Sequence, residues 1–372
     1  MTPLKSADIK SVLTRNCALK GIPASGIFEL TPRCNLRCKM CYVRLTPEQM
    51  APIGRELTAQ EWIKIGKECV DAGLVFLLLT GGEPTLRKDF CEIYEALTLM
   101  GLSISINTNG TMLTDEIKEL WQKLPPAQVN ITLYGVCRED YESLCGDGSA
   151  FDRVCESIDW LTQAGILVHL NTTVTPVNLH KWTQLEDFAK SRNAELRMTC
   201  YCFKPTRRYE CDSCTDFDRL TAEQAGELTA LDIFYREGID AIRKRAKHID
   251  TPVQRGCELD VGDPMQCLAG RSQFWLDWNG KLTPCGMITT PCVDLLCEEG
   301  FLSAWEKLKA MCAQIRLCKD CTNCPEKGSC MNCAAVTFTE TGAFDGKPEY
   351  MCRLNRAFRD TVKKIAEENP DE

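Results

Sequence analysis

Between Ile27 and Cys200, short apolar blocks alternate with segments whose apolar residues recur at helical spacing. The block at 74–79 is apolar at every position, which is typical of a strand that is covered on both faces. The apolar blocks predict strands at 27–30, 74–79, 102–106, 129–133, 166–174 and 195–199. The segments between them predict helices at 58–71, 89–100, 114–124, 151–164 and 179–192.

Alternating strands and helices favour a parallel sheet with right-handed crossover connections. Six such units are fewer than the eight of a closed barrel, so the expected fold class is α/β, a partial (β/α)6 TIM-like barrel that stays open. Beyond residue 200 the pattern changes to a helix from Thr221 toward His248, then to cysteine-bearing strands and loops, and finally to a helix over 352–367. The expected parts are an N-terminal segment (1–25), a core (26–200), a linker or helical bridge (201–256) and a cysteine-rich domain (257–372).

The composition is that of a globular protein, because 44% of the 372 residues are hydrophobic and 26% are charged. A net charge of −8 gives no electrostatic reason to bind nucleic acid. The longest apolar run, 74–79, is too short to span a membrane, and the N-terminus lacks the apolar stretch of a signal peptide. A cytoplasmic location is therefore expected. In that reducing compartment, 25 cysteines beside three histidines indicate metal or redox chemistry rather than disulfides.

Three cysteines lie close together directly after the first predicted strand. Cys34, Cys38 and Cys41 have the spacing CxxxCxxC. A [4Fe–4S] cluster has four irons, each normally held by one cysteine, so three thiolates leave one iron open for an outside molecule. In parallel α/β folds, the chemistry is found at the carboxyl ends of the strands, where this loop is expected. The alternatives are a zinc knuckle or buried free thiols, but structural zinc needs four ligands and the nearby sequence offers no fourth cysteine or histidine.

Further polar loops are expected at the same end of the barrel. Thr80-Gly81-Gly82-Glu83-Pro84 follows the second strand, and its two glycines allow the backbone to approach a ligand closely. Asn107-Thr108-Asn109-Gly110 follows the third strand, and Thr132-Leu133-Tyr134-Gly135 ends the fourth. Together with the three cysteines, this constellation resembles the radical S-adenosylmethionine (SAM) superfamily.

The resemblance implies that Cys34, Cys38 and Cys41 hold a catalytic [4Fe–4S] cluster, whose open iron is chelated by the amino and carboxylate groups of SAM. It also implies contacts with the SAM amino group by Gly81, Gly82 and Glu83, and with the ribose and carboxylate by Thr108, Asn109 and Thr132. Met40 stands where the superfamily usually has an aromatic residue near the adenine. Its thioether is a soft apolar substitute.

Twelve of the 25 cysteines crowd between residues 257 and 352. Their spacing resembles the SPASM extension of radical SAM enzymes that mature peptides and proteins: Cys267-x12-Gly280-x4-Cys285, then Cys321-x2-Cys324-x5-Cys330-x2-Cys333, then Cys352. The spacing between Cys330 and Cys333 is one residue shorter than in that family. The resemblance implies two auxiliary [4Fe–4S] clusters: a near cluster on Cys257, Cys267, Cys285 and Cys333, and a far cluster on Cys321, Cys324, Cys330 and Cys352, with Cys318 as a spare. Structural zinc is the alternative for such C-x2-C pairs.

Several other residues have more than one interpretation. His169 and Asn171 share a face of the fifth strand and either face the site or form a hydrogen-bonded interior pair. Arg207 and Arg208 suggest either recognition of an acidic leader peptide or a solvated surface pair. A further metal site, a hydrogen-atom donor and free thiols stay open for Cys200, Cys202, Cys211 and Cys214. Cys137 and Cys145, on the loop after the fourth strand, are candidates for a radical hydrogen donor.

The resemblance implies an enzyme that reductively cleaves SAM to a 5′-deoxyadenosyl radical and abstracts hydrogen from a peptide or protein. The leading expectation is a ribosomal-peptide maturase that forms a thioether or carbon–carbon crosslink; the alternatives are oxidation of the anaerobic sulfatase-maturating type and Cα epimerisation. Gly286 stands where sulfatase-maturating enzymes carry an aspartate, which counts against that oxidation. The expected partners are the substrate, a reductant such as flavodoxin or ferredoxin and, because only 33 residues precede Cys34, a separate leader-recognition protein. An iron–sulfur electron-transfer module is the alternative from another class, but it leaves the Gly-Gly-Glu-Pro loop unexplained.

Overall fold

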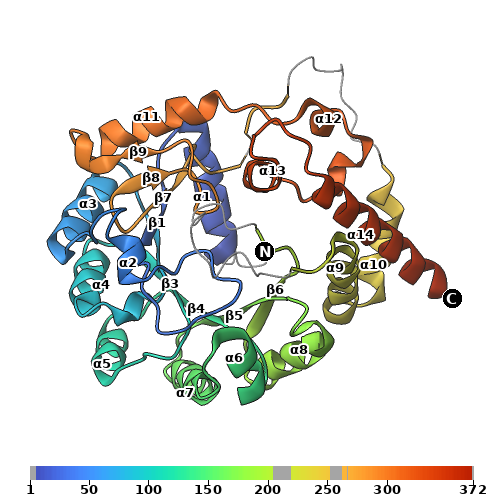
Figure 1. Ribbon diagram of the computed structural model, residues 1–372, viewed down its shortest axis with the longest axis horizontal. Coiled ribbons are helices and arrows are strands. Elements are labelled where there is room, and N and C mark those ends of the chain that lie inside the picture. Colours follow the sequence, from blue (N-terminus) through green and yellow to red (C-terminus); the bar gives the residue numbers. More distant parts are fainter. Residues whose placement is uncertain (1–5, 204–218, 252–261, 266, 371–372) are drawn as a thin grey trace.

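The computed structural model describes residues 6–203, 219–251, 262–265 and 267–370. Its centre is a nine-stranded sheet in the order β6-β5-β4-β3-β2-β1-β7-β8-β9. Strands β1 to β6 run parallel, and the helices between them cover the outside of the curved sheet (Figure 1). The prediction of an α/β partial barrel is confirmed. The six strands are β1 (Ser25–Glu29), β2 (Phe76–Thr80), β3 (Ser103–Thr108), β4 (Gln128–Thr132), β5 (Val168–Thr173) and β6 (Glu195–Thr199). The helices between them are α2 (Pro47–Met50), α3 (Ala59–Asp71), η1 (Pro84–Leu86), α4 (Phe90–Leu99), α5 (Asp115–Lys123), α6 (Arg138–Cys145), α7 (Ala150–Gln163), η2 (Leu179–Lys181) and α8 (Trp182–Ser191).

The register of the strands brings their carboxyl ends to one edge. Glu29, the last residue of β1, pairs with Thr80 at the end of β2, and Thr132 of β4 pairs with Asn171 of β5. The loops that follow these strands therefore meet at that edge. Beneath them the core is densely aromatic, and Phe28 of β1 lies against Trp62 of α3 with ring centroids 4.9 Å apart.

The sheet does not end at β1, which the sequence did not indicate. Strand β7 (Gln273–Leu276) pairs in parallel with β1, and β8 (Lys281–Thr283) and β9 (Val293–Asp294) continue it in antiparallel pairs. Helix α11 (Phe301–Ala313) covers this extension, with the rings of Phe274 and Phe301 4.7 Å apart. The sheet thus crosses the expected boundary at residue 256, although the division into four parts stays a prediction.

The expected N-terminal segment contains helix α1 (Ser6–Lys20), which lies in the middle of the ring of strands in Figure 1. The Lys10 ammonium lies 5.1 Å from the ring centroid of Phe76, the first residue of β2. Helix α1 therefore lies at the amino ends of the strands, opposite the loops described above. The chain after it is fixed by the Trp305 indole, which donates a hydrogen bond to the Gly21 carbonyl at 2.8 Å.

The helix expected from Thr221 toward His248 is two helices, α9 (Ala222–Glu237) and α10 (Ile239–Ile249). Gly238, with φ +80°, separates them because this left-handed conformation cannot continue a helix. The C-terminal helix α14 (Glu349–Glu368) lies along α9, and a Cβ on Gly226 would come within 2.3 Å of the Leu354 carbonyl oxygen. The remaining elements are η4 (Leu295–Cys297), α12 (Lys319–Thr322), η5 (Pro325–Gly328) and α13 (Ala334–Thr341). No described helix has the length and apolar character needed to cross a membrane.

Candidate active site

The carboxyl ends of the parallel strands surround a cavity of about 380 Å³. Nine of the ten residues that the sequence placed around the first cluster and SAM line this cavity: Cys34, Cys38, Met40, Cys41, Gly81, Gly82, Thr108, Asn109 and Thr132. The remaining wall includes Tyr134, Tyr201, Cys202, Phe203 and Met287. All of the described lining residues are uncharged. The cavity therefore offers sulfur, hydroxyl, amide and aromatic groups, but no described ionic side chain.

The cysteine loop points backbone donors at two of its three sulfurs. The Cys34 sulfur accepts a hydrogen bond from the Leu36 N–H at 3.4 Å, and the Cys41 sulfur accepts one from the Arg44 N–H at 3.2 Å. Burial raises the pKa of Cys34 to about 12, and the Leu36 N–H offsets part of that rise. Such donors favour the thiolate, which is the form that binds metal.

Cys38 is buried against the end of helix α6. The backbone on either side of it pairs with that helix, because the Arg37 N–H donates to the Cys145 carbonyl at 2.9 Å and the Lys39 N–H to the Leu144 carbonyl at 3.0 Å. A hydrogen bond with the Cys145 thiol and burial raise the pKa of Cys38, and the Tyr134 hydroxyl lowers it in part. Cys145 thus lies behind the cysteine loop and is not part of the cavity wall.

The two glycines after β2 allow this segment to pair tightly with the start of the cysteine loop. The Gly82 N–H donates to the Thr31 carbonyl at 2.7 Å, and the Glu83 N–H donates to the Arg33 carbonyl at 2.8 Å. A Cβ on Gly81 would lie 2.4 Å from the Thr31 carbonyl oxygen, and one on Gly82 the same distance from that of Arg33. Larger residues would push the two loops apart.

Glu83 is the one of the ten predicted residues that does not line the cavity. Its side chain is fully buried and accepts hydrogen bonds from the Thr85 hydroxyl (2.6 Å), the Thr108 hydroxyl (2.8 Å) and the Asn109 N–H (2.7 Å). Burial raises the pKa of Glu83, and these donors oppose the rise. The carboxylate therefore ties the loop after β2 to the end of β3.

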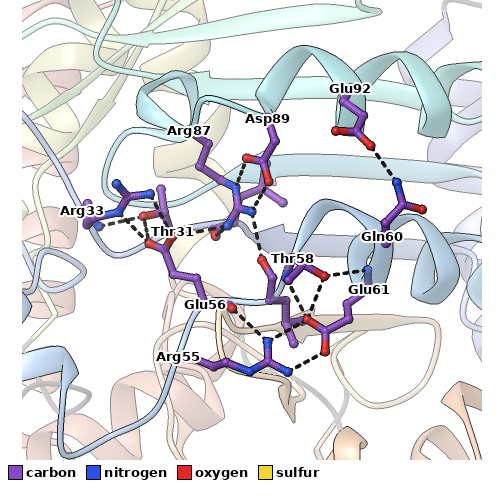
Figure 2. Close-up of polar contacts among 12 residues, drawn as sticks. Thr31, Arg33, Arg55, Glu56, Thr58, Gln60, Glu61, Arg87, Asp89 and Glu92 are labelled. Carbon is purple, nitrogen blue, oxygen red and sulfur yellow. Dashed lines mark hydrogen bonds and ion pairs between the residues drawn. The ribbon is translucent and has the colours of Figure 1, made fainter.

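A buried ion-pair network, which the sequence did not indicate, supports the cysteine loop from outside (Figure 2). The Arg87 guanidinium donates to the carbonyls of Leu30 and Leu57, both at 2.9 Å, and forms an ion pair with Asp89 at 2.7 Å. Glu56 accepts two hydrogen bonds from Arg33, each 2.8 Å, and one from the Thr31 hydroxyl. The network joins the end of β1, the segment before α3 and the start of α4. The sequence gives no signal for this network, because its charged residues stand in polar loops and find their partners only in the folded chain.

A second cavity, of about 350 Å³, lies in the cysteine-dense end of the chain. Its walls contain the four cysteines predicted for the far auxiliary cluster, Cys321, Cys324, Cys330 and Cys352. Cys318 adjoins this set, because burial and interaction with the Cys318 thiol raise the pKa of Cys321 to about 12. Two polar contacts cross the cavity wall, an ion pair between Asp263 and Lys327 and a 3.1 Å hydrogen bond from Asn355 to Glu326.

The residues predicted for the near auxiliary cluster are described only in part. Cys267 and Cys333 lie close enough for their charges to interact. The Cys333 sulfur accepts a hydrogen bond from the Val336 N–H at 3.5 Å, at the start of α13. Cys285 follows β8, and Cys257 lies outside the described residues.

The other sequence candidates have separate surroundings. His169 is buried, with its imidazole 3.5 Å from the Glu195 carboxylate. Cys202 lines the active-site cavity, whereas Cys137 lies 3.6 Å from the Lys181 ammonium. Arg207, Arg208, Cys211 and Cys214 lie outside the described residues.

Comparison with known proteins identifies this arrangement. The model of the radical SAM superfamily matches residues 28–189. The chain carries a radical SAM domain. Members of this superfamily hold a [4Fe–4S] cluster and SAM, and three thiols on one cavity wall with N–H donors to two sulfurs fit such a cluster. The protein is therefore an enzyme.

The proteins to which this chain is similar are named for different activities. An AdoMet-dependent heme synthase of Methanosarcina barkeri is 28% identical over 88% of this chain and 95% of its own length. A PqqA peptide cyclase of Bradyrhizobium diazoefficiens is 29% identical over 43% of this chain and 42% of its own. The crystal structure of Streptococcus suis SuiB bound to S-adenosylmethionine has a TM-score of 0.65 and 16% identity, covering 95% of this chain and 84% of that one. At that identity the likeness shows a shared fold.

Proposed function

We propose that this radical SAM enzyme uses the strand-end cavity to abstract a hydrogen atom from a peptide or protein substrate. The observation that carries the proposal is that Cys34, Cys38 and Cys41 share one cavity with the residues that end β2, β3 and β4. When bound, the [4Fe–4S] cluster and SAM supply reductive SAM cleavage and a 5′-deoxyadenosyl radical. The chain's own residues must bind these groups, orient the substrate and exclude water.

The three cysteines would hold the cluster, and the neighbouring backbone and side chains would hold SAM. Gly81 and Gly82 line the cavity, together with Thr108 and Thr132 at the ends of β3 and β4. Met40, next to Cys41, would lie beside the adenine. Glu83 would act through the Thr108 and Asn109 groups that it holds, since its carboxylate already accepts four hydrogen bonds from the protein.

We assign two auxiliary [4Fe–4S] clusters to the cysteine-dense end. The shared cavity of Cys321, Cys324, Cys330 and Cys352 supports the far cluster, because four thiols match its four irons. Cys267 and Cys333 support the near cluster, which Cys257 and Cys285 would complete. These clusters would accept an electron from the substrate radical or bind a substrate thiolate, and a flavodoxin or ferredoxin would reduce the first cluster.

Within this class we favour ribosomal-peptide maturation by a thioether or carbon–carbon crosslink. The similarity to a PqqA peptide cyclase supports a peptide substrate. An uncharged cavity suits a peptide backbone with apolar or neutral side chains. Oxidation of the sulfatase-maturating type fits less well, because a Cβ on Gly286 would lie 2.7 Å from the Trp275 indole and leaves no room for an aspartate.

A heme precursor is the second candidate substrate. It is favoured by the similarity to an AdoMet-dependent heme synthase, which extends over nearly the full length of both chains. Heme precursors carry several carboxylates, and proteins usually pair such groups with Arg or Lys. None of the described residues lining the active-site cavity is Arg, Lys or His, so we rank this candidate below a peptide.

The test is anaerobic incubation of the reconstituted, reduced enzyme with SAM. We expect about twelve irons per chain and release of 5′-deoxyadenosine. Cys34→Ala should abolish SAM cleavage while leaving about eight irons. Full iron content without 5′-deoxyadenosine would favour an electron-transfer module. Zinc in place of iron would contradict the assignment of two auxiliary iron–sulfur clusters.

Mass spectrometry then separates the substrate classes. Loss of two hydrogens from a candidate peptide would indicate a crosslink, and deuterium uptake at one Cα would indicate epimerisation. Loss of carbon dioxide from a carboxylated porphyrin, with peptides unchanged, would contradict the peptide proposal.

A further inference from the structure

Three side chains beside the cysteine loop form a closed ring of hydrogen bonds. The Asn109 amide nitrogen donates to the Asn35 side-chain oxygen at 2.9 Å, and the Asn35 amide nitrogen donates to the Thr111 hydroxyl at 2.8 Å. The Thr111 hydroxyl closes the ring by donating to the Asn109 side-chain oxygen at 2.6 Å. Each donor in the ring meets an acceptor, so the three side chains hold one another in a single arrangement.

The ring has only one consistent direction. The Asn109 side-chain oxygen also accepts a hydrogen bond from the Thr111 backbone N–H at 2.9 Å, and a backbone N–H can only donate. That oxygen must therefore face Thr111, which turns the Asn109 amide nitrogen toward the cysteine loop. The Asn109 backbone is fixed as well, because its N–H donates to the buried Glu83 carboxylate at 2.7 Å.

The Asn109 amide nitrogen lies 3.6 Å from the Cys34 sulfur. It has two hydrogens, of which one is used by Asn35, and the other is available for this sulfur. Asn109 is 5% exposed and Thr111 6% exposed, so water does not compete for their side chains, whereas Asn35 lies on the exposed side of the ring. Cys34 thus has a side-chain donor in addition to the Leu36 N–H.

We propose that the Asn109–Asn35–Thr111 ring sets the reduction potential of the cluster on Cys34, Cys38 and Cys41 by holding the Asn109 amide against the Cys34 sulfur. Reduction by one electron from an external donor adds negative charge to the cluster, and a hydrogen bond to a ligand sulfur stabilises that charge. The amide therefore makes reduction easier. Asn35 and Thr111 are positioning residues. The Asn109 amide donates a hydrogen bond to the Cys34 sulfur rather than to the SAM ribose or carboxylate. This inference rests on the proposed function.

Thr111 offers a sharp test, because it is outside the cavity wall and its hydroxyl can be removed without a change of shape. Thr111→Val removes two of the three ring bonds, whereas Thr111→Ser keeps the hydroxyl. Thr172→Val is the matched control, since Thr172 is buried in β5 and its hydroxyl has no hydrogen-bond partner among the described residues. The measurement is a potentiometric titration followed by electron paramagnetic resonance. Addition of SAM identifies the cluster, because it changes only the signal of the cluster that binds it.

Thr111→Val keeps the backbone N–H that orients Asn109 but no longer holds Asn35. We therefore expect it to make reduction less favourable by less than tenfold, a fall of under about 59 mV for one electron. Thr111→Ser and Thr172→Val should keep the wild-type potential. A wild-type potential in Thr111→Val would overturn the proposal. If that variant does not take up its cluster, Asn109→Asp decides: it places an oxygen against the Cys34 sulfur, and an unchanged potential there would equally overturn the proposal. Absence of any SAM-sensitive signal in the wild-type enzyme would instead contradict the proposed function.

Discussion

The two cysteine sites of this protein differ in what holds them in place. The loop with Cys34, Cys38 and Cys41 is paired along its backbone to the segment after β2 and to the end of α6, and the Arg87 network supports it from outside. Three cysteines of the far site, Cys321, Cys324 and Cys330, lie in or beside the four-residue elements α12 and η5, and Cys352 lies on α14. Their polar contacts are mostly local side-chain contacts, such as the ion pair of Asp263 with Lys327. We infer that the protein builds the first site before any cofactor arrives. The second site would gain much of its order from the cluster proposed for it.

The largest effect expected from this difference concerns removal of the far cluster. Cys324→Ser combined with Cys330→Ser should lower the iron content by about four per chain. Because structural metal sites contribute on the order of 10 kcal/mol to folding, amide protection over 319–333 should fall to that of an unfolded segment. Hydrogen–deuterium exchange followed by mass spectrometry measures this, and strands β1 to β6 should keep their protection.

Two controls accompany that experiment. Cys297→Ser changes an exposed thiol outside the cavity and should leave protection unchanged. Cys34→Ala removes a proposed ligand of the first cluster and should leave the cysteine loop protected, because the backbone pairing there remains. Equal loss of protection at both sites would show that the two are not built differently.

The next effect concerns the Arg87 network. Arg87→Met leaves the Leu30 and Leu57 carbonyls and the Asp89 carboxylate without their buried donor. Loss of one partner of a buried ion pair costs about 3–5 kcal/mol, so the free energy of unfolding measured by urea denaturation should fall by that amount.

Arg55→Met is the control from the same region. The Arg55 side chain is 63% exposed and forms an ion pair with Glu61, whereas that of Arg87 is 4% exposed. An exposed ion pair contributes below about 1 kcal/mol. If the two variants lost equal stability, the cysteine loop would not depend on its buried network.

The smallest effect concerns the contact between α8, the last helix of the barrel, and α9, which follows it in the chain. Glu186 on α8 and Asp232 on α9 are buried together, and Arg236 forms an ion pair with Asp232 at 3.0 Å. Burial and the Asp232 charge raise the pKa of Glu186 to about 7. The folded protein therefore binds a proton there more tightly than the unfolded chain does. Stability is lost as the pH rises from the ordinary glutamate range, about 4.3, through about 7.

Chemical denaturation at pH 5 and pH 7.5 measures this loss. We expect a decrease on the order of 1 kcal/mol, allowing for solvent screening. Glu186→Gln should remove this part of the pH dependence, because a glutamine does not titrate. An identical pH dependence in this variant would place the titrating group elsewhere.

Elements with a strong local pattern were predicted well from the sequence. The helix predicted to begin at residue 58 is α3, with a capping box of Thr58 and Glu61 at its start, and the strand predicted at 195–199 is β6 with the same bounds. The loops with Cys34, Gly81 and Thr108 also meet as expected, because parallel topology requires it.

Features that depend on distant partners were not predicted. Strand β7 has only four residues, and its place beside β1 is set by the tertiary fold. The break at Gly238 was missed because a single glycine is tolerated in many helices. The role of Glu83 was also beyond the sequence, since its donors Thr108 and Asn109 become neighbours only when β2 and β3 pair.

The parallel pairing of β7 with β1 has a practical consequence for anyone who divides the chain. Strand β7 covers the edge of β1, which is buried along its whole length. A fragment that stops near residue 250 would present that edge to solvent as a row of unpaired N–H and C=O groups, a template for another strand. Such a fragment should self-associate, which size-exclusion chromatography would detect. By pairing with β1, strand β7 would then keep the barrel edge from pairing with other chains.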